Sequence, residues 1–135
     1  MPLITWNDSL SVNIRKIDNQ HQKLIGMIND LDAAMKEREG QTAIGKIISD
    51  LLDYTDYHFK TEEDFFVQYH YPELAHHKKT HTQLFQKAAT LKQEYDSGRK
   101  MVSVKVLNLL SDWLWDHIMK TDKEYSEFLN GKGLT

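Results

Sequence analysis

Imidazole and carboxylate side chains recur in this sequence at spacings suited to holding metal ions. His58 and Glu62 lie four positions apart, as do His77 and His81. Side chains four apart project from one face of an α-helix, so each pair can point toward a common centre. The candidate metal ligands are His21, His58, Glu62, His77, His81, His117 and Asp122. Burying such a group in an apolar interior is costly unless a cation compensates it, so the set predicts a metal site.

One spacing in this set does not fit a regular helix. His117 and Asp122 are five positions apart, which on an ideal α-helix would turn Asp122 roughly 140° away from His117. We therefore expect a distortion between them, either a π-bulge or the end of the helix.

The number of donors favours two metal ions. Five histidines and two carboxylates exceed the ligands of a zinc site, and this donor set suits iron better than magnesium or calcium. If each of two ions takes about six ligands, the histidines, two bridging carboxylates and one bridging oxide or hydroxide fill every position except one. An open position predicts the binding of a small molecule, and we expect dioxygen to be held there and released.

These side chains must be positioned by helices, because apolar residues repeat with helical spacing throughout the chain. Glycine and proline punctuation divides the sequence into four segments, at about residues 18–38, 42–69, 72–95 and 101–121, with a shorter helical piece beyond the last. Asp18 is the expected N-cap of the first segment. Long helices joined by short loops pack as antiparallel neighbours. The predicted fold is therefore all-α, an antiparallel up-down-up-down four-helix bundle with a short N-terminal arm.

The candidate ligands should lie at one level of this bundle. His21 and His58 are each about eighteen residues from the turn near Gly40, which places both about 27 Å from it along their helices. The same count around the other two turns brings the ligands of the third and fourth segments to this level.

Composition excludes several other classes of protein. The 135 residues carry a net charge of -3, with 17 basic and 20 acidic residues, so no basic face for nucleic acid is expected. The chain has no cysteine, which rules out disulfides and thiolate-ligated metals. No apolar run is long enough to span a membrane, and residues 1–7 do not resemble a secretory signal. We expect one cytoplasmic domain covering residues 1–135.

The order and spacing of the candidate ligands resemble the complete signature of the hemerythrin family. The resemblance covers nearly the whole chain, and the other matching positions are Trp6, Asp18, Gln20, Tyr71, Pro72, Trp113, Leu114 and Tyr125. It implies two irons bridged by Glu62, Asp122 and an oxide or hydroxide. It also implies one iron held by His77, His81 and His117, and a second held by His21 and His58 that carries the open position.

The resemblance further implies a pocket for dioxygen. Leu114, one turn before His117, is similar to the family residue that lines it. Ile118, Phe59 and Trp113 are further candidates, although ordinary core packing explains them as well. His70 and His76 are not needed by the site and are expected at the surface.

Alternative functions remain open from the sequence. A di-iron oxidase of the ferritin-like kind needs Glu-x-x-His on two helices, and only Glu73 and His76 have that spacing. We therefore expect a binding protein and not an enzyme: an oxygen carrier, store or delivery partner for an oxygen-using enzyme. An oxygen or redox sensor module attached to a signalling domain is the main alternative.

Overall fold

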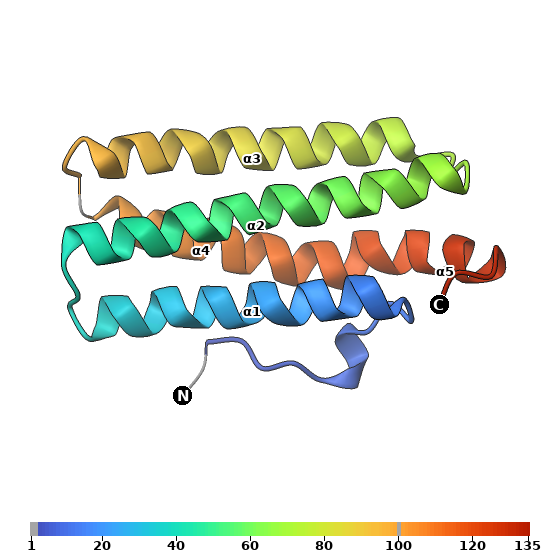
Figure 1. Cartoon of the computed structure of the whole chain (residues 1–135), viewed down its shortest axis with the longest axis horizontal. Coiled ribbons are helices and arrows are strands. Elements are labelled where there is room, and N and C mark those ends of the chain that lie inside the picture. The colour runs from blue at the N-terminus through green and yellow to red at the C-terminus, as the bar shows by residue number, and fades with distance from the viewer. Residues whose placement is uncertain (1–2, 100) are drawn as a thin grey trace.

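Four long helices run alternately up and down in the computed structural model of this chain (Figure 1). The structure describes the backbone of residues 3–99 and 101–135, and the side chains of these residues except Lys120 and Thr121. Within these two ranges there is no strand. The predicted all-α up-down-up-down bundle is confirmed. Residues 1 and 2, which belong to the segment 1–7 compared with a secretory signal, lie outside the described residues.

The helices have bounds close to those expected from the apolar pattern. The long helices are α1 (Arg15–Lys36), α2 (Gln41–Gln68), α3 (Leu74–Asp96) and α4 (Val102–Asp116). A π-helical turn η2 (His117–Asp122) continues α4 into a short α5 (Lys123–Gly131), and a 3-10 turn η1 (Asp8–Leu10) lies in the N-terminal arm beside α1 (Figure 1). No helix in the described part of the chain has both the length and the apolar character needed to cross a bilayer.

Three helices end in a left-handed residue. Arg38, His70 and Gly98 have φ angles of 56°, 55° and 106° after α1, α2 and α3. In each case the next amide reaches back to a carbonyl five residues earlier, which caps the helix end. The left-handed turn after α1 therefore falls on Arg38 and not on Gly40, which instead precedes α2 with an ordinary φ of -66°.

The expectation that Asp18 is the N-cap of the first helix is wrong. The helix begins three residues earlier, at Arg15, and its N-cap residue Ile14 makes no side-chain capping bond. The Asp18 carboxylate accepts hydrogen bonds from the Val12 amide at 2.9 Å and from the Ser11 hydroxyl. It thus holds the arm against the first turn, where a negative charge is also favoured by the helix dipole.

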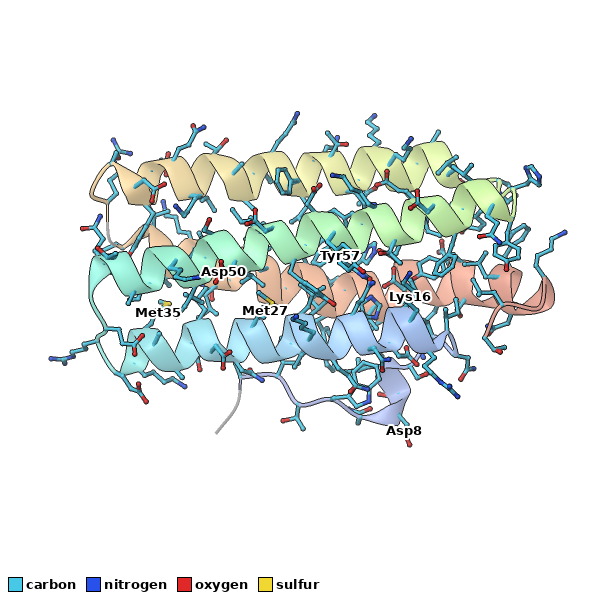
Figure 2. The ribbon with its side chains drawn as sticks, in the orientation of Figure 1. Asp8, Lys16, Met27, Met35, Asp50 and Tyr57 are labelled. Atoms are coloured by element: carbon cyan, nitrogen blue, oxygen red, sulfur yellow. The ribbon has the colours of Figure 1, made fainter. Side chains whose placement is uncertain are left out.

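The core consists of two apolar clusters. The larger one fills most of the bundle, and it packs against Met27 and Met35 on the side of α1 that faces the other helices (Figure 2). The smaller one lies where α5 and the N-terminal arm meet the bundle; its buried members are Val12, Ile14, Ile17, Phe66, Tyr71, Tyr125 and Leu129. On α2, Leu52 belongs to the larger cluster and Phe66 to the smaller. His58 and Glu62 lie between them, so the polar site is enclosed by apolar packing on both sides.

Candidate metal centre

Every candidate ligand predicted from the sequence is buried in one region of the bundle. Their exposed fractions range from 0% to 3%, for His21, His58, Glu62, His77, His81, His117 and Asp122. They come from α1, α2, α3 and η2, the turn that continues α4, so the expectation that these residues share one level is confirmed. Apolar packing on either side separates them from bulk water.

The first group of donors joins α1, α2 and η2. His21 Nε2 and His58 Nε2 are 3.0 Å apart. His21 Nε2 also lies 3.0 Å from an Asp122 oxygen, and His58 Nε2 lies 3.0 Å from Glu62 Oε1. One atom from each of these four residues falls within 4.8 Å of all the others, a spacing that fits a single ion.

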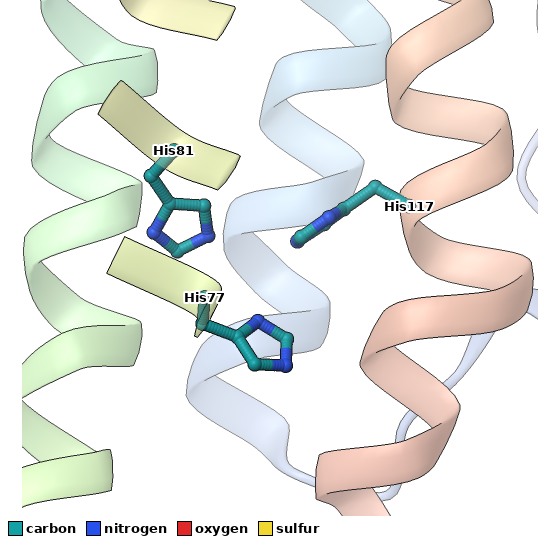
Figure 3. A group of neighbouring side chains, drawn as sticks. All are labelled: His77, His81 and His117. Atoms are coloured by element: carbon teal, nitrogen blue, oxygen red, sulfur yellow. The ribbon is translucent and has the colours of Figure 1, made fainter. Parts of the chain in front are cut away.

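The second group is made of three histidines, His77, His81 and His117. Figure 3 shows His77 and His81 projecting from α3 toward His117, which comes from η2 at the end of the neighbouring α4. Their ring centroids are 5.4 to 6.1 Å apart, and one nitrogen from each lies within 4.8 Å of the others. This arrangement fits three faces of a second ion.

The two carboxylates touch both groups. Glu62 Oε1, which contacts His58, is also 3.5 Å from His81 Nε2. Asp122 places Oδ2 by His21 and Oδ1 2.6 Å from His117 Nε2. Each carboxylate is therefore positioned as a bridge between the two donor groups.

Most of these polar atoms lack a hydrogen bond. Within the described part of the chain, both oxygens of Glu62 and of Asp122 are buried without one, as are Nε2 of His81 and of His117, because the short contacts are not aligned for donation. Buried polar groups are nearly always hydrogen-bonded in native proteins. Lone pairs that converge on shared points fit cations as the missing partners, and nitrogen with carboxylate oxygen is a donor set suited to iron.

The π-helical turn explains the spacing that an ideal helix could not. His117 and Asp122 are the first and last residues of η2, and in a π-helix residues five apart are hydrogen-bonded neighbours. The distortion predicted from the sequence is confirmed. It brings His117 and Asp122 onto the same face, where both reach the site.

Outer hydrogen bonds fix the orientation of His58. The Thr61 hydroxyl donates to the Tyr57 carbonyl, so it accepts from the Gln20 amide nitrogen at 3.1 Å. The Gln20 carbonyl oxygen then faces His58 Nδ1 at 2.7 Å and accepts its proton. This leaves the Nε2 lone pair of His58 directed into the site, which is the tautomer that a metal needs.

Sequence reasoning alone did not find these outer partners. Gln20 and Thr61 each precede a candidate ligand along the chain, and Glu63, which accepts from His81 Nδ1 at 2.9 Å, follows one. Adjacency to a ligand was the one available signal, but it does not tell which histidine the side chain reaches.

Burial and neighbouring charges shift the pKa values of the site in the absence of metal. Burial lowers the pKa of His77 to about 4 and also lowers that of His58. Burial opposes the charge on His117 as well, but Asp122 and Glu62 raise its pKa to about 10. Glu62, despite its burial, has a pKa well below its usual value because of His58 and His117. The metal-free site thus keeps Glu62 ionised beside a charged His117.

The four apolar candidates for a dioxygen pocket differ in what they contact. Phe59 stacks on His81 with ring centroids 3.9 Å apart, and Trp113 stacks on His117 at 4.7 Å. Both therefore pack beside the group of three histidines. Leu114 and Ile118 are each 1% exposed and belong to the larger apolar cluster.

The remaining histidines and one tyrosine complete the surroundings. His70 and His76 are exposed, as predicted. Tyr125 is fully buried with its ring 5.7 Å from that of His77, and burial, with Asp122 and Glu62 adding to its effect, raises the pKa of its hydroxyl.

A four-helix bundle that encloses two adjoining donor groups, rich in histidine and spanned by two carboxylates, defines a class of non-haem proteins with a dinuclear metal centre. The family model described as "Hemerythrin HHE cation binding domain" matches residues 12–129. The chain belongs to the hemerythrin family. Membership implies a non-haem di-iron site that binds dioxygen, in agreement with the cluster of histidines and carboxylates.

Relatives and solved structures are similar over almost the full chain. A bacteriohemerythrin of Stenotrophomonas maltophilia is 33% identical over 127 residues, covering 94% of this chain and 82% of the relative. One of Methylococcus capsulatus is 33% identical over 132 residues, covering 96% and 99%. A crystal structure of wild-type hemerythrin superposes with a TM-score of 0.86 at 33% identity, covering 94% of this chain and 98% of that one.

Proposed function

We propose that this protein binds dioxygen reversibly at a non-haem di-iron centre, as a carrier, store or delivery protein. The observation that carries the proposal is the pair of carboxylates, Glu62 and Asp122, each of which contacts histidines of both donor groups. Such an arrangement suits two ions held side by side and bridged.

The residues divide into two coordination spheres on this proposal. Three histidines, His77, His81 and His117, would hold one iron, and His21 and His58 would hold the other. Glu62 and Asp122 would bridge the two, with an oxide or hydroxide as the third bridge. The sphere with two histidines has fewer protein donors, so the open position belongs there.

The iron pair supplies the redox chemistry for reversible dioxygen binding, and the chain supplies the surroundings. Neutral imidazoles dominate the donor set, which favours ferrous iron more than a cage of carboxylates would. Leu114 and Ile118, buried within one turn of His117, help exclude water from the site, while Phe59 and Trp113 hold the rings of His81 and His117 by stacking. Keeping water and anions out protects the reduced state.

Iron content and a reversible visible spectrum test this function. The protein should hold two irons per chain, and absorption bands should appear when oxygen is added to the anaerobically reduced protein and disappear when it is removed. His77→Ala should lose iron, while His76→Ala should not, because the neighbouring His76 is exposed. A wild-type protein without bound iron, or one that is oxidised irreversibly, would refute the proposal.

A further inference from the structure

Two histidines of the site donate from Nδ1 to acceptors of different charge. His58 Nδ1 donates to the neutral amide of Gln20, whereas His81 Nδ1 donates to the carboxylate of Glu63 at 2.9 Å. Among the described residues, Nδ1 of His21 and of His77 has no hydrogen-bond partner at all. In the described part of the chain, Glu63 is therefore the only carboxylate that accepts from Nδ1 of a site histidine, and that histidine belongs to the group of three.

Glu63 reaches His81 from the edge of the protein. Its side chain is 22% exposed and lines a surface pocket between α2 and α3, whose wall includes His81, Phe59 and Lys60. Partial contact with water keeps the desolvation cost of this carboxylate small. The nearby Lys60 ammonium forms its ion pair with Asp56 at 2.9 Å and acts on Glu63 only at longer range.

We propose that Glu63 is a positioning residue for the metal centre: it holds His81 with Nδ1 protonated and Nε2 free to bind, and its negative charge lowers the reduction potential of the bound iron. The inference about the potential rests on the proposed di-iron function. A carboxylate that accepts from a ligating imidazole fixes its tautomer and increases its basicity. A more basic ligand stabilises ferric over ferrous iron, so the charge favours the oxidised state of the iron held by His81.

Substitution by glutamine separates the charge from the hydrogen bond. Glu63→Gln keeps an oxygen that accepts from His81 Nδ1 but removes the charge, so the iron should be retained while its reduction becomes easier. We expect about a tenfold change in the one-electron equilibrium, equal to roughly +59 mV. Asp64→Asn is the matched control, because Asp64 is the exposed neighbour on the same helix and its loss removes the same charge without touching His81. Equal potentials in the two variants would overturn the role of the charge.

Substitution by leucine removes the acceptor and tests the positioning role. Glu63→Leu should weaken iron binding by about tenfold or more, as measured by competition with a chelator. In the metal-free protein, nitrogen NMR of His81 should find the proton on Nδ1 in the wild type and divided between the Nδ1 and Nε2 tautomers in Glu63→Leu. An unchanged His81 tautomer would overturn the positioning role. Because this measurement needs no iron, it separates failure of the inference from failure of the di-iron function.

Discussion

Replacing Leu114 by alanine should both destabilise the protein and expose the metal centre to water. Leu114 is 1% exposed and lies within the larger apolar cluster, three residues before His117. Full burial places the substitution among those that leave a cavity, with a loss of about 3–5 kcal/mol in the free energy of unfolding. Three residues correspond to about 4.5 Å along the helix, so the cavity would open beside the candidate ligands.

Autoxidation measures the second consequence. Water and anions that enter the cavity would reach the open coordination position, and we expect autoxidation of the oxygenated protein to become about tenfold faster. The assay follows the decay of the visible absorption in air-saturated buffer, while urea unfolding gives the loss in stability.

Leu110→Ala provides the matched control. Leu110 is also 1% exposed on α4, but it lies seven residues before His117, about 10.5 Å along the helix. It should lose similar stability without a change in autoxidation. If both variants oxidised equally fast, general loosening and not local access would be the cause, and an unchanged rate for Leu114→Ala would refute the shielding role.

Three further predictions concern stability. Arg38→Gly should raise the free energy of unfolding by about 1 kcal/mol, since Arg38 has a φ of 56° that glycine adopts freely; a lower urea midpoint would contradict this. Asp18→Ala should lower the free energy of unfolding by about 1.5–3 kcal/mol, because the carboxylate accepts from the Val12 amide and from the Ser11 hydroxyl. An unchanged thermal midpoint would contradict a stabilising role for these two hydrogen bonds. In the metal-free protein, stability should fall as the pH drops from 6.5 toward 4, where the unfolded chain protonates before folded His77 does. It should also fall as the pH rises from 6.5 toward 10, where folded His117 keeps a proton that the unfolded chain releases; urea titrations that show no maximum between these limits would contradict both shifts.

Local periodicity accounts for what could be predicted about the fold. Apolar residues at helical spacing mark the helices, and the count of residues from each turn places the ligands at one level, because the rise per residue is nearly constant. The π-helical turn was predictable for the same reason: the spacing of His117 and Asp122 is incompatible with a regular helix facing one site. Helix ends follow less directly from the sequence, since the left-handed position after α1 is occupied by Arg38 and not by a glycine.

The sequence by itself determined the helices and the identity of the side chains that enter the core, since both follow from spacing along one helix, and the short loops determined the alternating order. The tertiary structure alone decided which outer groups support them. Gln20 on α1 orients His58 on α2, and Glu63 on α2 orients His81 on α3. These contacts depend on how far each helix is rotated about its axis and which neighbour it faces. That rotation is set by packing over the entire bundle, so no local pattern in the sequence encodes it.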